Sequence, residues 1–144
     1  MRKIKLVIVH HSAGPTSQPV EEIRKLHLAR GWADIGYHWV IREEQPGVWQ
    51  VFQGRPEGVI GAHDVDQNSE SIGVCLLGNY EAVFPSAAAW NALVETVIWI
   101  LRRYGLSVSA VEGHREHEPA STPTACPGFA PDSLRTSIAM RMAE

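Results

Sequence analysis

The chain has 144 residues, of which 44% are apolar and 20% charged, and its net charge at pH 7 is −3. This length suits one compact domain with its own core, and the apolar content excludes wholesale disorder. The slightly acidic balance excludes the basic surface that a nucleic acid partner requires. Only two cysteines occur, Cys75 and Cys126, so no disulfide framework is indicated and we expect both thiols to be reduced.

The start of the chain and its most apolar helix candidate argue against export and membrane insertion. Only four apolar residues, Leu6 to Val9, follow the basic first residues, whereas a secretory signal needs about 7 to 15. The segment from Trp90 to Leu101 is interrupted by polar residues and falls short of the ~20 residues that a membrane span needs. We therefore expect a soluble protein without a signal peptide.

The first third of the chain predicts one strand and one helix. A run of β-branched and aliphatic residues from Ile4 to Val9 predicts a buried central strand, which places His10 at a strand end. Pro19 and the acidic residues after it predict a helix that ends near Arg30. The expected inner face of this helix carries Ile23, Leu26 and His27.

The middle of the chain carries strand signals. Tyr37 to Ile41 and Val48 to Phe52 are expected to form a hairpin, because Pro46 and Gly47 lie between them. The apolar run from Ile72 to Leu77 predicts a further buried strand.

The last third predicts two helices and a short strand. Ser86 is expected to cap a helix that ends near Tyr104, where a glycine follows. A short strand is expected near Ala110 to Glu112, and Pro131 opens the last helix. Strands that alternate with helices predict a single α/β domain over residues 1–144, with a central mixed β-sheet flanked by about three main helices.

Two histidines and one cysteine stand out as candidate metal ligands. His10 follows the first strand, His114 follows the short strand, and Cys126 lies twelve positions further on. A fold that brings the strand ends together would assemble two imidazoles and a thiolate, which suits a catalytic zinc site with a fourth position for water. The competing ligands are His117, three residues after His114, and His11, which would point to the opposite face of a continuing strand.

The two cysteines have different surroundings in the sequence. Cys126 has an alternative role as a nucleophile, because a thiolate beside histidine can attack a carbonyl carbon directly. Cys75 lies inside an apolar run, where cysteine usually serves as a small buried hydrophobe. We therefore expect Cys75 to be structural.

Several short stretches, in this order and spacing, carry a family resemblance over nearly the whole chain. The chain resembles the zinc-dependent N-acetylmuramoyl-L-alanine amidases of the type-2 family, which are related to peptidoglycan recognition proteins and include the short phage-lysozyme amidases. The matching stretches are Val9 to Ala13, Arg30 to Ile41, Ile60 to His63, Asn68 to Tyr80, Gly113 to Arg115, and Ala125 to Gly128.

The resemblance implies the fold of that family, with His10, His114 and Cys126 holding one Zn²⁺ ion. Water activated by the ion would attack the amide that joins N-acetylmuramic acid to the first L-alanine of the stem peptide. The tyrosine that matches Tyr37 lies beside the metal in the family, where a phenol can hydrogen-bond the attacking water or the developing oxyanion. The alternative role of Tyr37 is that of a half-buried strand aromatic.

Thr124 departs from the phage-type pattern, which has a lysine two positions before the cysteine ligand. Threonine supplies no positive charge, but its hydroxyl can donate one hydrogen bond, so we expect a lower rate for the same reaction. Catalytic recognition proteins of animals often have threonine there. Non-catalytic recognition proteins usually lack the cysteine ligand, so the presence of Cys126 favours an enzyme.

Four further residues are candidates for the substrate groove. His63 and Asn68 match loop positions that border the groove in the family, with loop stabilisation as the alternative role of each. Trp32 is expected to place its indole against a sugar or peptide, and Arg55 to direct its guanidinium at a stem-peptide carboxylate. His38 is expected to pack or to form hydrogen bonds rather than to ligate.

The expected protein is a monomeric zinc amidase that cuts bacterial peptidoglycan as the endolysin of a phage or prophage. It would accumulate in the host cytoplasm before it reaches the cell wall. One alternative is a cytoplasmic amidase that recycles soluble anhydromuropeptides with the same ligands. A second alternative is a peptidoglycan-binding module with little catalysis, which Thr124 makes conceivable.

Overall fold

The computed structural model describes residues 2–117 and 123–144. A five-stranded mixed sheet lies at its centre in the order β3-β2-β4-β1-β5. Its strands are β1 (Leu6–His11), β2 (Trp39–Gln45), β3 (Val48–Gln53), β4 (Ser71–Leu76) and β5 (Val111–Gly113). β1 lies between β4 and β5 and is parallel to both, while β2 is parallel to β4 and antiparallel to β3.

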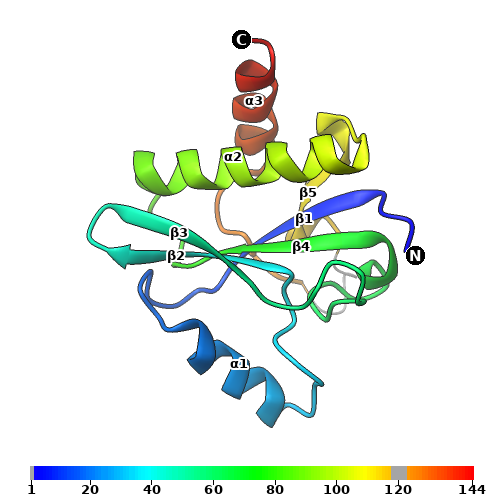
Figure 1. Ribbon diagram of the computed structural model, residues 1–144. Helices are drawn as coiled ribbons and strands as arrows, with labels where there is room; N and C mark the ends of the chain where they lie inside the picture. The colour runs from blue at the N-terminus through cyan, green and yellow to red at the C-terminus, as the bar shows by residue number, and fades with distance from the viewer. Residues whose placement is uncertain (1, 118–122) are drawn as a thin grey trace.

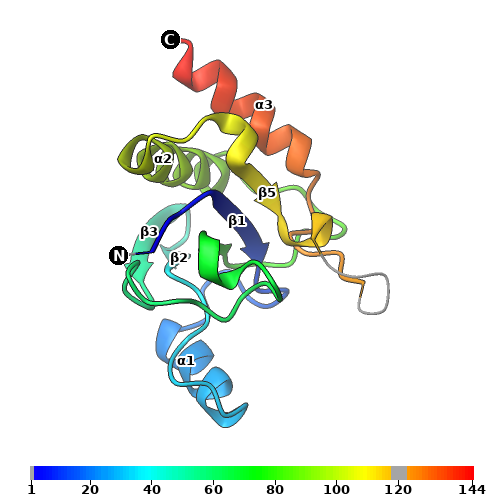
Figure 2. The same ribbon diagram turned by 90° about the vertical axis from the view of Figure 1, so that its right-hand side faces the viewer.

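Three α-helices in the described part of the chain flank this sheet. α2 (Ala87–Tyr104) crosses one face, and α1 (Val20–Ala29) lies on the other side (Figure 1). α3 (Pro131–Met142) packs against α2 (Figure 2). The prediction of an α/β domain with a mixed sheet and three main helices is confirmed. Within residues 2–117 and 123–144, no helix is both long and apolar enough to cross a membrane.

Helix α2 supplies much of the core, because its sequence encodes both its ends and its buried stripe. Ser86 Oγ accepts a hydrogen bond from Ala89 N at 3.2 Å, and Gly105 ends the helix at a φ of 64°. The stripe between these ends recurs at helical spacing: Leu93, Val94, Val97, Ile98 and Leu101. Burial of each such side chain contributes about 1.5–3 kcal/mol, so this stripe contributes substantially to stability.

Side chains alternate between the two faces of the sheet. On β1, Val7 and Val9 belong to the core under α2, so Ile8 and His10 point to the other face. The parallel register places His10 opposite Cys75 of β4. The carboxyl end of β1 therefore presents an imidazole on the side of the sheet where α1 lies.

Among the strand boundaries that differ from the predictions, two lie at or next to candidate site residues. β1 continues to His11 rather than ending at Val9, because β4 offers pairing partners to both histidines. β2 begins at Trp39, so Tyr37 precedes the strand instead of lying in it. The Tyr37 carbonyl still accepts a hydrogen bond from Arg55 N at 2.9 Å, which anchors this irregular segment.

Helix α1 buries a narrower stripe than expected. Ile23 and His27 are buried, but Leu26 is 54% exposed. Ile23 and His27 are four positions apart and share a face, whereas Leu26 is rotated by about 60° from Ile23 toward solvent. The placement of Leu26 on the inner face is therefore wrong.

Candidate active site

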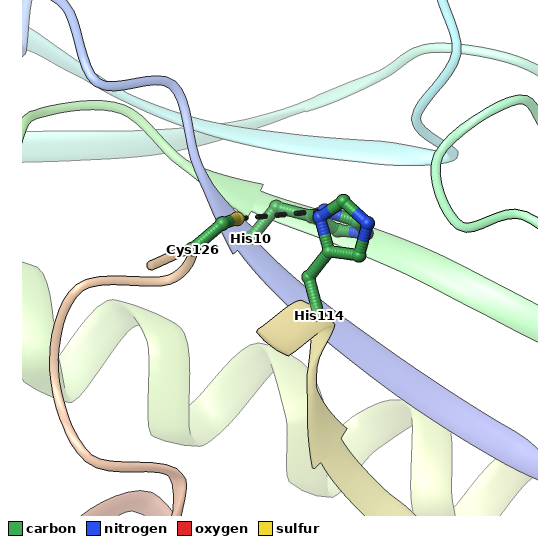
Figure 3. Close-up of side chains that lie close together, drawn as sticks. All are labelled: His10, His114 and Cys126. Atoms are coloured by element: carbon green, nitrogen blue, oxygen red, sulfur yellow. Dashed lines mark hydrogen bonds between the residues drawn. The ribbon is translucent and has the colours of Figure 1, made fainter. Parts of the chain in front are cut away.

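Two imidazoles and one thiol meet at the carboxyl ends of β1 and β5. The ligand atoms of His10, His114 and Cys126 all lie within 4.8 Å of one another, and Figure 3 shows the three side chains converging. Cys126 Sγ lies 3.7 Å from His10 Nδ1. His10 is 1% exposed and Cys126 9% exposed, whereas His114 is half-buried. Such a group can hold a metal ion.

The sheet register explains why His114 meets His10. β5 pairs with β1 so that Glu112 lies opposite Ile8. The same register, continued for two residues, brings His114 level with His10 and onto the same face. Two histidines that are distant in the sequence thus become neighbours, with their ring centroids 4.6 Å apart.

The segment before α3 brings Cys126 to the two histidines. The Cys126 carbonyl accepts a hydrogen bond from Arg115 N at 2.7 Å, which ties this segment to the residue after His114. His11 N donates to Cys126 Sγ at 3.3 Å. The thiol is therefore held in place by a backbone donor from the strand that carries His10.

The imidazoles of the two competing ligands do not join the cluster. His11 points to the opposite face, where its Nδ1 accepts a hydrogen bond from Tyr80 N at 3.1 Å. His117 pairs with Glu112. Neither residue belongs to the cluster whose ligand atoms come together in the described part of the chain.

A cavity of about 550 Å³ opens beside the cluster. The three cluster residues line it. So do five of the six other residues that the sequence assigned to catalysis or substrate binding: Trp32, Tyr37, His63, Asn68 and Thr124. The cavity therefore collects most of the predicted site in one place.

Tyr37 stands beside the cluster with its ring centroid 5.2 Å from that of His10. Burial, followed by the nearby thiols of Cys75 and Cys126, raises the pKa of the Tyr37 phenol well above its usual value. The group therefore stays a protonated phenol in the cavity wall.

His10 and His63 are neutral at physiological pH. Burial lowers the pKa of His10 well below its usual value, and the nearby His63 and His114 lower it further. Burial also lowers the pKa of His63 to about 3. A neutral imidazole keeps a lone pair, which metal ligation requires.

His63 and Asn68 lie at the cavity wall and also organise the loop before β4. His63 Nδ1 lies 2.9 Å from His10 Nε2, so this imidazole contacts a cluster residue directly. Asn68 Oδ1 accepts hydrogen bonds from His63 N at 2.8 Å and Asp64 N at 2.9 Å. Loop stabilisation, the alternative role of Asn68, thus has a clear structural basis.

Arg55 does not face the cavity. Its guanidinium donates to the backbone carbonyls of Ile35 at 2.7 Å, Ile60 at 2.8 Å and Asp34 at 3.2 Å. The residue is 9% exposed and is not part of the cavity lining. The expected contact with a substrate carboxylate is therefore replaced by a contact that joins two loops through three of the five N–H donors of Arg55.

Trp32 and Thr124 occupy different parts of the wall. The Trp32 ring packs at 4.7 Å from His27 and lies under the Arg30 guanidinium at 5.3 Å. Thr124 Oγ1 accepts a hydrogen bond from Cys126 N at 3.2 Å, so this hydroxyl shapes the turn that carries the thiol.

Sequence reasoning placed His27 on the inner face of α1 but missed its place in the cavity wall. Its Nδ1 accepts a hydrogen bond from Gly36 N at 2.9 Å, and its ring packs 5.6 Å from that of Tyr37. Burial lowers the pKa of His27 to about 4. An imidazole on the inner face of an amphipathic helix was the signal that could have found it.

Comparisons with known proteins place this arrangement in a family. The model of the N-acetylmuramoyl-L-alanine amidase family matches residues 1–129. The endolysin of Escherichia phage T7 is 37% identical over 131 residues, which cover 85% of this chain and 80% of that protein. The chain belongs to the N-acetylmuramoyl-L-alanine amidase family. It is an enzyme that hydrolyses the amide bond between N-acetylmuramic acid and L-alanine.

Solved structures show the same fold. The N-acetylmuramoyl-L-alanine amidase LysC from Clostridium intestinale URNW has a TM-score of 0.83 at 23% identity, and the match covers 96% of this chain and 87% of that one. A mutant of Drosophila PGRP-LB, solved in complex with tracheal cytotoxin, has a TM-score of 0.72 at 28% identity. That match covers 89% of this chain and 77% of the PGRP-LB chain.

Proposed function

We propose that the protein is a zinc amidase that degrades bacterial peptidoglycan as the endolysin of a phage or prophage. The cluster of His10, His114 and Cys126, with ligand atoms within 4.8 Å of one another, carries the proposal of zinc. Two imidazoles and a thiolate are common zinc donors, and a site with three protein ligands leaves one position open.

A bound zinc ion would polarise the scissile carbonyl and lower the pKa of water. The residues of the cavity supply hydrogen-bond donors. Tyr37, which remains a protonated phenol, donates a hydrogen bond to the carbonyl oxygen as it gains negative charge. Thr124, beside the thiol ligand, offers a second hydroxyl in place of a cation.

The cavity wall orients the substrate. Trp32 presents an indole to a sugar or peptide, and His63 and Asn68 border another part of the lining. Tracheal cytotoxin, the ligand of the PGRP-LB structure, is a monomeric diaminopimelic acid-type peptidoglycan. This likeness supports peptidoglycan as the polymer that the cavity receives.

The endolysin role is supported by the phage T7 relative, 80% of whose length this chain matches. We propose that residues 1–144 act as one catalytic domain and as a monomer, which reaches the wall from the host cytoplasm. A recycling amidase would use the same ligands, but it would need only soluble anhydromuropeptides as substrates.

The test compares the native chain with Cys126→Ser and with the matched control Cys75→Ala on purified sacculi. Zinc content is measured for each protein, and mass spectrometry detects released stem peptides. We expect about one zinc per native chain and per control chain, with release of stem peptides by both. Cys126→Ser should lose both zinc and release, and a chelator should abolish release by the native chain.

Each other outcome selects an alternative. Zinc binding and adhesion to sacculi without release would favour a binding module. Activity that is confined to soluble anhydromuropeptides would favour recycling. Activity of the native chain that resists the chelator but disappears in Cys126→Ser would favour Cys126 as a nucleophile.

A further inference from the structure

A chain of hydrogen bonds leads from the metal cluster to the first residue of β4. His10 Nε2 lies 2.9 Å from His63 Nδ1. His63 Nε2 lies 3.2 Å from Ser71 Oγ, which in turn bonds the carbonyl of Gln67 at 2.8 Å. His10 turns its other nitrogen, Nδ1, toward the Cys126 thiol. The chain therefore begins on the far side of the ring that would hold the metal.

The Gln67 carbonyl, at the end of this series of hydrogen bonds, determines which atom is the donor in each of them. A carbonyl oxygen accepts only, so Ser71 must donate its proton to Gln67, and Ser71 Oγ must accept from His63 Nε2–H. His63 is buried, and burial favours the neutral imidazole, which carries one proton. Its Nδ1 is then a lone pair that accepts from His10 Nε2–H.

The result is a defined tautomer of His10. With the proton on Nε2, the lone pair of Nδ1 faces the cluster, where a metal would need it. The opposite tautomer would point an N–H at the cluster and block ligation. Hydrogen bonds to the remote nitrogen of a metal-ligating histidine set its tautomer and raise its basicity.

The backbone around His63 is built to seat its ring. A Cβ at Gly73 would lie 2.5 Å from His63 Cδ2, and one at Gly61 would lie 2.7 Å from the same atom. Asn68 Oδ1 holds His63 N from the other side. Ser71 is fully buried. These contacts leave the imidazole little freedom to turn away from His10.

We propose that His63 and Ser71 are positioning residues that hold His10 in the tautomer competent for metal binding. The proposal rests on the proposed zinc site. It assigns His63 to the support of a ligand rather than to direct contact with the substrate, although the residue also reaches the cavity wall. Ser71, for which the sequence predicted no role, becomes part of the same hydrogen-bonded support of His10.

The first test measures zinc affinity by competition with a chromogenic chelator. His63→Ala should weaken zinc binding by about 10–100-fold, the usual effect of losing such a partner. His63→Asn should restore much of the affinity, because its amide oxygen can accept from His10 Nε2–H. Ser71→Ala should cause a smaller loss, since it removes only the second link. The control His27→Ala removes a buried imidazole that takes no part in the hydrogen bonds between His10, His63 and Ser71. It should bind zinc as the native protein does.

The second test uses zinc-free protein and nitrogen NMR of the imidazoles. We expect His10 to carry its proton on Nε2, with scalar coupling to His63 Nδ1 across the hydrogen bond. This readout does not depend on zinc. If the native chain bound no zinc but showed the coupling, the proposed function would fail and the hydrogen-bond chain would stand.

Three results would overturn the inference. The first is native zinc affinity in both His63 variants. The second is an equal loss in His63→Ala and His63→Asn, which would point to the volume of the ring rather than to its acceptor. The third is a His10 that carries its proton on Nδ1 in the zinc-free native protein.

Discussion

The two faces of the central sheet are covered by different kinds of side chain. The face under α2 is covered by aliphatic and aromatic side chains, which form the larger core cluster. The other face has a small apolar cluster of Ile23, Ile35, Val40, Cys75 and Leu77. Beside it lie His10, His27, His38 and His63, which are all buried. Hydrocarbon burial dominates one face, whereas the other combines a small apolar cluster with buried histidines that form hydrogen bonds, so most of the core and the candidate site lie on opposite sides of one layer of strands.

Leu93→Ala should test the hydrocarbon face with the largest effect. Leu93 is fully buried in α2, and truncation of a buried leucine costs about 2–5 kcal/mol of unfolding free energy. The matched control is Leu26→Ala at a position that is 54% exposed, where we expect little change. Urea unfolding measures both variants. A loss of zinc affinity in the refolded Leu93→Ala protein would contradict the separation of the two faces.

Tyr37→Phe should test the polar face through catalysis. Removal of one donor to a developing oxyanion lowers kcat by about 10²–10³-fold, and zinc content and unfolding free energy should stay near native values. Tyr80→Phe is the control on the opposite face, because the Tyr80 hydroxyl donates to the Leu77 carbonyl. It should lower stability and leave kcat unchanged. Native kcat in Tyr37→Phe would remove the phenol from the mechanism.

A fall in pH should lower the free energy of unfolding through the buried histidines of the polar face, because the apolar side chains under α2 do not titrate. Burial lowers the pKa of His38 from 6.5 to about 4, so the unfolded chain binds this proton more readily than the folded one. The stabilisation is therefore complete above pH 6.5 and declines as the pH falls toward 4, by on the order of 3 kcal/mol.

His38→Asn should remove the share of this pH dependence that His38 carries, while the lowered pKa values of His27 and His63 keep theirs. The amide oxygen can replace Nδ1 as the acceptor of Gly73 N, and asparagine does not titrate. Urea titrations of zinc-free protein between pH 7 and pH 4 measure the slope for both chains. Equal slopes would show that His38 does not carry the effect.

Ser86→Ala should give the smallest change. It removes the side-chain acceptor of Ala89 N at the start of α2, which costs about 1 kcal/mol. Ser86→Asp keeps an acceptor and should retain near-native stability. Thermal unfolding distinguishes the two, and equal losses would show that the cap contributes nothing specific.

The hydrocarbon face could be predicted from the sequence far better than the polar face. Helix α2 is marked by a capping serine, a helical stripe and a terminal glycine, all of which are local signals. The end of β1 was misplaced because two histidines look like a strand end, although β4 pairs with both. Local patterns carry no information about a partner that lies far away in the chain.

The site shows the same limit. His10, His114 and Cys126 could be selected because each follows a strand or fits a motif, and the structure brings all three together. The contact between His10 and His63 joins residues 53 positions apart, and Arg55 meets carbonyls rather than the cavity. Hydrogen bonds of this kind depend on the final packing of loops, so residue type alone could not assign them.

The close approach of Gly73 to the His63 ring bears on how mutations in this gene should be read. A change from glycine to alanine inside a buried strand would ordinarily pass as mild, since it adds one methyl group and suits the backbone. Here that methyl group would lie 2.5 Å from the imidazole that supports His10. Such a variant would alter no ligand and no surface residue, yet it should displace the support of His10 and cost stability as well. The position therefore bears a chemical constraint, although glycine itself has no side chain.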